Sequence, residues 1–296
     1  MKLIDSIKVN NQLGESVIWD AQEQCVWWID IFGKNIYRLQ WPSKNLDVFS
    51  TTERPCAIGL TDKDNILIVA FETGVSLYNP KTKEIIEWIY RPFKLNSGIR
   101  FNDGKIDRQG RFWISTMIES TEKINITQSG LYCIESNGKI TKHLSDFTIG
   151  NSLAFSPCST KLYFSDSNQQ TIWQFDFNSD QAKIFNQSIF SKLEGDACPD
   201  GADVDNEGNL WCTNWGDSSL SKYSIFDNEK IDESLPVSQP TCLAFGGKNL
   251  DYLFVTSANY QLSKDELAEQ PNSGSLLIYQ TSSKGIAPTR FGEVNG

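Results

Sequence analysis

Histidine is almost absent from this sequence: among its 296 residues there is one, His143. A zinc site built on several histidines, or a pair of catalytic histidines, therefore cannot form within one chain. His143 stands between Lys142 and Leu144 and is expected on an outer strand in a structural role. A Ser-His-Asp triad has little support, because the sequence also lacks a G-x-S-x-G motif.

Long apolar runs are missing too. No stretch approaches the ~20 apolar residues of a membrane span, and the opening residues MKLIDSIK lack the apolar run of a signal peptide. The seven cysteines are scattered and contain no C-x-x-C pair, which argues against a disulfide framework or a zinc ribbon. These absences predict a cytoplasmic protein with reduced thiols and no membrane partner.

Basic residues are outnumbered by acidic ones, giving a formal net charge of -10. This balance argues against nucleic acid or an anionic membrane as a partner, because both require a basic surface. It suits a protein that attracts cations. The length allows two average domains or one large all-β domain, and 9 Trp, 9 Tyr and 17 Phe supply strand-forming aromatics for a large core.

A polar turn followed by an aromatic or β-branched strand recurs along the chain at residues 25–30, 65–69, 110–114, 161–166, 208–212 and 252–256. A second strand follows each after a short loop, at residues 35–39, 74–78, 130–134, 171–175, 220–223 and 275–279. Units of about 40–50 residues with three or four short strands are typical of propeller blades. We predict an all-β, six-bladed β-propeller with four-stranded antiparallel blades, forming a single domain over residues 1–296. The strand at 3–9 is expected to close the last blade, and 263–268 to form one short helical turn at most.

The segments that precede the six strands align without a gap. Arg100-Phe101-Asn102-Asp103-Gly104 and Pro199-Asp200-Gly201 are the clearest pair, since each leads to a turn and then a Trp-containing strand. The first strand of a propeller blade lines the central channel, so the leading residues should form a ring at one mouth of it. The ring residues are Glu15, Ala57, Asn102, Asn151, Asp200 and Thr241.

Two carboxylates and two amides fall on this ring. Carboxylates that face one another in a confined channel are costly unless a cation compensates them. Their hard oxygen atoms suit calcium, magnesium or manganese, and zinc or ferrous ion is also possible. Each motif taken alone is an ordinary turn sequence. The shared repeat position is what favours a metal site in the central channel.

Several motifs in order along the chain resemble the SMP-30/gluconolactonase/regucalcin family. They are Leu13-Gly14-Glu15-Ser16, Arg100-Phe101-Asn102-Asp103-Gly104-Lys105, Thr116-Met117, Gly150-Asn151-Ser152, Pro199-Asp200-Gly201, Phe245-Gly246-Gly247-Lys248-Asn249 and Gly285-Ile286-Ala287-Pro288. The resemblance implies a six-bladed propeller with one catalytic divalent metal, for which calcium is the leading candidate. Members hydrolyse lactones of sugar acids, and others are described as calcium-binding regulators or luciferin-regenerating enzymes.

The resemblance also implies site residues. The family's metal ligands fall on Glu15, Asn151 and Asp200, and its substrate-contacting Arg and Asn fall on Arg100 and Asn102. Animal regucalcins carry two acidic residues after Thr-Met, whereas Ile118-Glu119-Ser120 offers only one here. We assign Glu119 to substrate binding in place of the missing contact; the alternative is that this chain prefers a different substrate.

These residues predict a carboxylic ester hydrolase of the gluconolactonase type. A metal ion would polarise the carbonyl of an aldonolactone, such as glucono-1,5-lactone or a pentonolactone, and Asp200 would activate water. The alternatives are a calcium-binding regulatory or scaffold propeller without lactonase activity, and a luciferin-regenerating activity. The expected partner is a small sugar lactone, with the protein a monomer or a weak homodimer.

Overall fold

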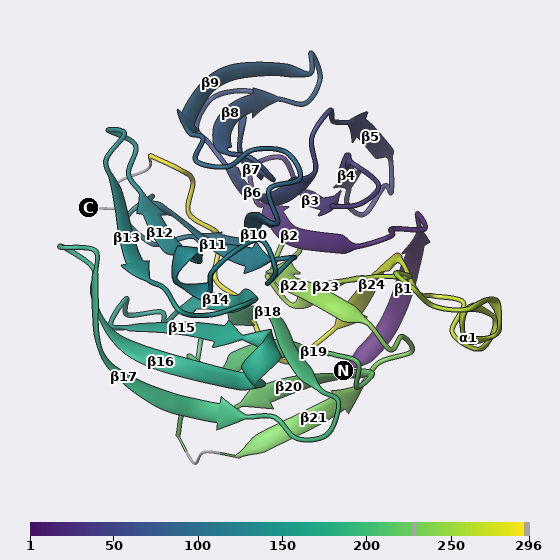
Figure 1. Cartoon of the computed structure of the whole chain (residues 1–296). Coiled ribbons are helices and arrows are strands. Elements are labelled where there is room, and N and C mark those ends of the chain that lie inside the picture. Colours follow the sequence, from purple (N-terminus) through teal and green to yellow (C-terminus); the bar gives the residue numbers. More distant parts are fainter. Residues whose placement is uncertain (227–228, 293–296) are drawn as a thin grey trace.

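Six four-stranded antiparallel sheets are arranged as blades around a central axis in the computed structural model, which describes residues 1–226 and 229–292 (Figure 1). The innermost strands are β2 (Gly14–Asp20), β6 (Pro55–Leu60), β10 (Ile99–Ile106), β14 (Gly150–Phe155), β18 (Cys198–Val204) and β22 (Pro240–Gly246). The second strands are β3 (Cys25–Asp30), β7 (Leu67–Phe71), β11 (Phe112–Ile118), β15 (Lys161–Asp166), β19 (Leu210–Trp215) and β23 (Tyr252–Ser257). The predicted six-bladed all-β propeller is confirmed.

The third strands are β4 (Asn35–Gln40), β8 (Val75–Asn79), β12 (Leu131–Ile134), β16 (Thr171–Asn178), β20 (Ser219–Tyr223) and β24 (Ser275–Gln280). The outer strands are β5 (Leu46–Ser50), β9 (Glu84–Tyr90), β13 (Ile140–Leu144), β17 (Lys183–Lys192), β21 (Lys230–Ser234) and β1 (Lys2–Lys8). β1 pairs with β24 from Lys2 opposite Gln280 to Lys8 opposite Ser275, so the N-terminal strand closes the last blade as predicted. That pairing ties the two ends of the ring together.

Helical structure is confined to short segments in the described ranges. α1 (Lys264–Glu269) lies where a single helical turn was expected, and Ser263 caps it. The 3-10 turns η1 (Ile126–Gln128) and η2 (Ser167–Gln169) lie in connections between strands. No helix within residues 1–226 and 229–292 is long and apolar enough to cross a membrane. Each of the seven cysteines, all at described positions, is a free thiol.

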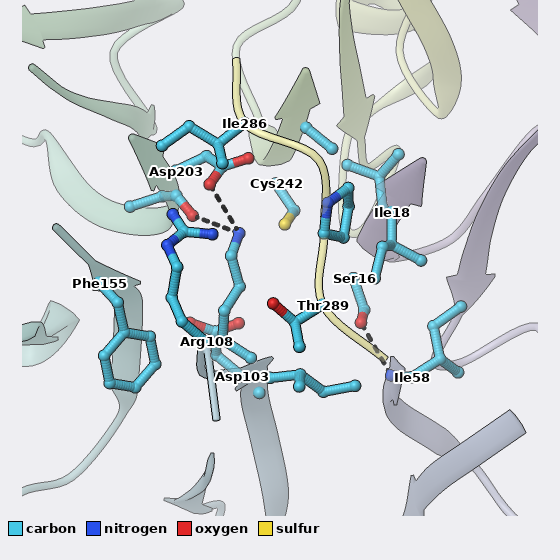
Figure 2. Close-up of a pocket in the computed structure, with 17 residues that line it drawn as sticks. Ser16, Ile18, Ile58, Asp103, Arg108, Phe155, Asp203, Cys242, Ile286 and Thr289 are labelled. Atoms are coloured by element: carbon cyan, nitrogen blue, oxygen red, sulfur yellow. Dashed lines mark hydrogen bonds and ion pairs between the residues drawn. The ribbon is translucent and has the colours of Figure 1, made fainter. Parts of the chain in front are cut away.

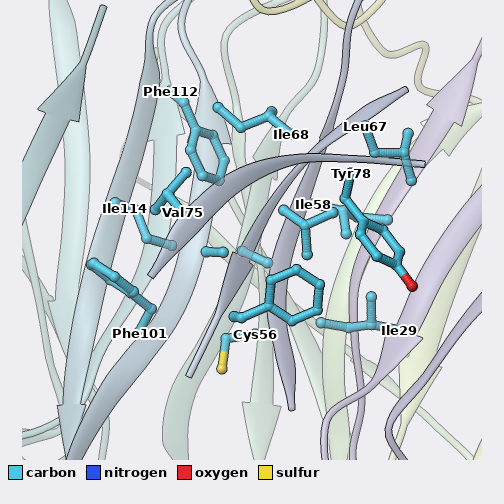
Figure 3. Close-up of a cluster of buried hydrophobic side chains, with 14 of the residues drawn as sticks. Ile29, Cys56, Ile58, Leu67, Ile68, Val75, Tyr78, Phe101, Phe112 and Ile114 are labelled. Atoms are coloured by element: carbon cyan, nitrogen blue, oxygen red, sulfur yellow. The ribbon is translucent and has the colours of Figure 1, made fainter. Parts of the chain in front are cut away.

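Side chains between neighbouring blades form the core. Figure 3 shows one such cluster, in which Ile29 of β3, Ile58 of β6, Phe101 of β10 and Phe112 of β11 meet from three successive blades. Each is at most 3% exposed. Burial of a large apolar side chain contributes roughly 1.5–3 kcal/mol, so the cluster holds the inner strands at fixed positions around the channel.

A repeated Asp-x-x-Gly-x-x-Trp sequence forms the same hydrogen bond in two of these blades, between the tryptophan and the aspartate of the repeat. The Nε1 atom of Trp113 donates to Asp107 at 2.8 Å, and that of Trp211 donates to Asp205 at 3.0 Å. Both carboxylates are buried, and each also accepts backbone N–H groups of its own turn. The two segments whose similarity revealed the repeat are therefore equivalent in structure.

The last described stretch, residues 281–292, crosses the end of the channel opposite the N-termini of the inner strands; we call it the C-terminal strap (Figure 1). Its backbone bonds to four blades, through Asn206 N to Lys284 O, Gly285 N to Leu250 O, Phe291 N to Leu60 O and Gly292 N to Gly110 O. Gly285 lies so close to Phe245 that a side chain at position 285 would collide with the Phe245 side chain. The strap thus closes one end and leaves the other as the mouth.

Candidate functional site

The inner strands are irregular at the point where the candidate residues occur. The strand register shifts between Glu15 and Ile18, between Phe101 and Gly104, between Asn151 and Ala154, and between Pro199 and Ala202. Extra residues in one strand of a pair re-aim side chains and are common beside active sites. At Ser16 and Ser152 the backbone is left-handed, with φ of 50° and 54°, so the chain turns directly after Glu15 and Asn151.

A cavity of about 390 Å³ opens at the mouth of the channel. Its lining includes all six residues assigned from the sequence, namely Glu15, Arg100, Asn102, Glu119, Asn151 and Asp200. The other two ring positions do not line it. In the strand that carries Ala57, the register shift is shorter and lies between Pro55 and Ala57. The hydroxyl of Thr241 is buried and donates to the Gly14 carbonyl. Four of the six ring residues therefore face one cavity.

Asp200 and Glu15 are acidic groups with little to stabilise their charge. Burial raises the pKa of Asp200 well above its usual value, and the Glu15 and Asp103 carboxylates raise it further. Burial, together with Asp103, raises the pKa of Glu15 to about 8. Within the described chain, the hydrogen bond from Ser152 reaches the backbone carbonyl of Asp200, and none reaches its carboxylate.

Asn151 is held in one orientation by its neighbours. Its Nδ2 donates to Ser167 Oγ at 2.8 Å, and its Oδ1 accepts from Asn102 Nδ2 at 2.8 Å. Asn102 is in turn fixed by Gly150, whose carbonyl accepts from Nδ2 at 3.0 Å. The amide oxygen of Asn151 has a second lone pair, so this network can present it to a cation.

Arg100 lies beneath the mouth, with its side chain 2% exposed. Its Nε donates to Glu119 at 3.0 Å, and its Nη1 donates to Asn102 Oδ1 at 2.7 Å. Glu119 also accepts two hydrogen bonds from Arg54, at 2.8 and 2.9 Å. Burial alone would raise the pKa of Glu119, but the two arginines outweigh it and hold that pKa below the usual value.

A third carboxylate, Asp103, lies just below the ring and was not singled out from the sequence. It accepts from the Leu153 N–H at 2.9 Å, and burial raises its pKa. It also lines a second cavity, of about 60 Å³, between the inner strands and the C-terminal strap (Figure 2). There Lys105 pairs with Asp203 at 3.2 Å, beside Thr289 of the strap. This space is too small for a sugar lactone, so of the two cavities along the channel the one at the mouth has room for a substrate.

Glu15, Asn151 and Asp200 suit a divalent metal ion by their chemistry. Their side chains offer hard oxygen donors, and a cation would compensate carboxylates whose charge the protein leaves largely unmatched. Among the residues that the structure describes, no group of three or more His, Cys, Asp and Glu side chains is set up to hold a metal. The candidate set differs from such a group because one of its three donors is an amide.

The structure adds residues that the sequence did not single out. Arg54 comes from the loop before β6, and its only sequence signal is a charge next to a strand. Apolar side chains line the outer part of the cavity: Leu13, Phe32, Ile149, Trp215 and Tyr260. Cys198, two residues before Asp200, also lines the cavity. Burial and the Asp200 and Asp196 carboxylates raise its pKa, which argues against a nucleophilic thiolate.

Comparison with known proteins gives consistent matches over most of the chain. The family model described as SMP-30/Gluconolactonase/LRE-like region matches residues 13–259. The chain is 30% identical to an L-arabinolactonase of Azospirillum brasilense over 283 residues, covering 95% of this chain and 92% of that protein. It is 29% identical to regucalcin of Gallus gallus over 286 residues, or 95% of each protein. A solved structure of a calcium-binding protein, regucalcin from Agrobacterium tumefaciens, matches with a TM-score of 0.86 and 26% identity, covering 98% of this chain and 97% of that one.

Proposed function

The chain belongs to the SMP-30/gluconolactonase/LRE-like family, and from that premise we propose that it hydrolyses lactones of sugar acids with the help of one divalent metal ion. The observation that carries the proposal is the meeting of Glu15, Asn151 and Asp200 at the floor of one open cavity, with Arg100 and Asn102 beside them. The Asp200 carboxylate accepts no hydrogen bond in the described chain and the Glu15 carboxylate accepts one, from the Ser16 N–H at 3.1 Å, so a cation would compensate charges that the protein stabilises little. A cavity of about 390 Å³ is large enough for a small lactone.

Each residue has a part in this scheme. Glu15, Asn151 and Asp200 would hold the metal, which when bound supplies Lewis acidity toward a carbonyl oxygen. Asp200 would also act as general base toward water. Arg100 and Asn102 would contact the substrate with what hydrogen-bonding capacity remains to them, and Glu119 would accept from a substrate hydroxyl through its Oε2 atom.

The reaction is the opening of a cyclic ester. The oxygen of water forms a bond with the lactone carbonyl carbon while Asp200 takes a proton from that water. The bond between the carbonyl carbon and the ring oxygen then breaks, and the ring oxygen receives a proton as it leaves. The product is the open hydroxy acid. The fixed polar groups of the floor reduce the reorganisation that this charge movement would require in water.

The proposed donors are hard oxygen atoms, which suit calcium, magnesium and manganese better than zinc or ferrous ion. Calcium is our first choice because similar proteins are named regucalcin and one of them a calcium-binding protein. The proposed substrates are aldonolactones such as glucono-1,5-lactone, or pentonolactones. A gluconolactonase-type ester hydrolase is the enzyme class that this combination favours.

Acid release from a panel of glucono-, galactono-, xylono- and arabinonolactone tests the proposal. The chelated protein is supplied with each divalent metal in turn, and the rate is compared with spontaneous opening. We expect metal-dependent acceleration with at least one lactone. If no pair of lactone and metal exceeds the spontaneous rate, while calorimetry still detects metal binding, the protein is a metal-binding propeller without this activity.

A further inference from the structure

The layer of side chains directly above the proposed metal ligands is largely apolar. Side chains two positions apart on a strand point to the same face. The residues two positions before Glu15, Asn102, Asn151 and Asp200 therefore form the next layer toward the mouth. They are Leu13, Arg100, Ile149 and Cys198, and all of them line the cavity. Arg100 is the one strongly polar member of this layer.

Aromatic rings continue this apolar wall outward. Phe32 and Tyr260 lie with ring centroids 4.8 Å apart, and both line the cavity together with Trp215. Tyr260 is 38% exposed, which places it at the entrance. A ligand whose reacting end lies on the polar floor must rest its other end against these rings.

Arg100, which lines the cavity, and its neighbour Arg54 are already neutralised. Arg54 pairs with Glu72 at 2.8 Å and with Glu119 at 2.8 Å, and Arg100 pairs with Glu119 at 3.0 Å. A negatively charged substituent on the ligand would have to compete with these carboxylates. It would also face Glu119 at close range, which is unfavourable for two like charges.

At the floor of the cavity, Arg100 and Asn102 have few hydrogen-bonding atoms left for substrate hydroxyls, and the polar groups of Asn168 and Tyr260 lie farther out in its lining. Besides Glu119 and Asn102, Arg100 donates to the Phe101 carbonyl at 2.9 Å and to Met117 Sδ at 3.0 Å. Asn102 Nδ2 spends both of its hydrogens on protein acceptors, as described above. A hydroxyl that is moved out of water without a partner is penalised, whereas a methyl group against an aromatic ring gains from burial.

We infer that the preferred substrate is a neutral deoxy-sugar lactone, with a methyl group in place of the terminal hydroxymethyl group. The inference rests on the proposed lactone hydrolysis and narrows its substrate. The lactone carbonyl lies at the oxygen-rich floor. The methyl end lies against Leu13, Ile149 and the aromatic rim.

The test compares three lactones of one sugar: the 6-deoxyhexono-lactone, the parent hexono-lactone and the 6-phosphorylated parent. With the metal-loaded full chain, we expect kcat/KM to be about tenfold higher for the deoxy compound than for the parent. The phosphorylated compound should fall at least about 100-fold below the parent, because its charge meets Glu119 while Arg54 and Arg100 are already paired.

A variant in the apolar layer supplies an independent readout. Ile149→Gln should bring the ratio of deoxy to parent kcat/KM close to one or below it, while the matched Ile149→Val should keep the wild-type ratio. Equal or higher kcat/KM for the parent or the phosphorylated lactone in the wild type would overturn this inference and leave lactone hydrolysis standing. Failure to open any lactone would overturn both.

Discussion

Replacing Glu119 by glutamine removes the anion that joins two arginines at the mouth. Glutamine keeps the size of the side chain but offers one acceptor and an NH₂ group where two oxygen atoms stood. Glu119 accepts from Arg54 at 2.8 and 2.9 Å and from Arg100 at 3.0 Å. The variant therefore removes the ion-pair partner of Arg100 in a place where the arginine side chain is only 2% exposed.

The expected loss of stability lies between two limits. Exposed ion pairs contribute about 0.2–1 kcal/mol, and removing one partner of a buried pair costs about 3–5 kcal/mol. Arg100 is buried, Arg54 is 17% exposed and Glu119 is 27% exposed. We expect Glu119→Gln to lower the free energy of unfolding by about 2 kcal/mol, which corresponds to roughly 4 °C in Tm.

Urea denaturation of a double-mutant cycle measures this effect. The cycle comprises the wild type, Arg54→Gln, Glu119→Gln and the double variant, and we expect a coupling energy of about 1 kcal/mol. Glu122→Gln is the matched control, because Glu122 is exposed in the same loop. The two arginines hold the pKa of Glu119 below its usual 4.5, so its stabilising effect is present above that value and disappears as pH falls through the lowered pKa. If Glu119→Gln is no less stable than Glu122→Gln at pH 7, the ion-pair argument is wrong.

The remaining predictions concern the floor, the strap and the single histidine. Asp200→Asn should reduce kcat at least about 1000-fold with circular dichroism unchanged; retention of a tenth of the activity would place the base elsewhere. At a free metal concentration of 100 times Kd, the free energy of unfolding of the wild type should be about 2.7 kcal/mol higher than that of the chelated protein. The same calorimetric scan should show little metal-dependent increase for Asp200→Asn. Arg290 Nη2 donates to Asp20 at 2.6 Å. Arg290→Ala should therefore lower the free energy of unfolding by about 1–2 kcal/mol and speed proteolysis of the strap. An unchanged cleavage rate would contradict this. Burial, with Arg111 and Lys139, lowers the pKa of His143 from 6.5 to about 4. Between these two pKa values the unfolded chain binds more protons than the folded one, so the free energy of unfolding should fall as pH falls from 6.5 to 4. The expected loss is about 1–2 kcal/mol after allowance for partial exposure. If the free energy of unfolding changes equally with pH in the metal-saturated wild type and in metal-saturated His143→Phe, this prediction is wrong.

The six repeated units could be predicted from the sequence because each blade is built from neighbours in the chain. Turn residues and alternating strands recur at a nearly constant interval, and a register shift follows Glu15, Asn151 and Pro199 in the same way. This common irregularity is why an alignment without gaps brought equivalent residues together. In the second blade along the chain (blade 2, strands β6 to β9) the register shift is shorter, between Pro55 and Ala57, and the sequence pattern did not reveal it.

The contacts of Glu119 could not be predicted in the same way. Arg54 is 65 positions away in the chain and lies in the loop before a different blade. Two loops of unrelated sequence meet there because blades 2 and 3 are adjacent in the closed ring. The proposed role of Glu119 in substrate binding followed from the resemblance, and its fixation by two arginines is visible in the tertiary structure alone.

Local sequence patterns suffice for the blades, their order and the ring position that Glu15, Asn151 and Asp200 share, because strand periodicity and turn chemistry act between residues close in the chain. The surroundings of that ring are set by tertiary contacts. The aromatic rim, the arginines around Glu119 and the strap over the far end are contacts between segments that ring closure brings together. Such contacts depend on the position of every blade at once, and no local pattern encodes them.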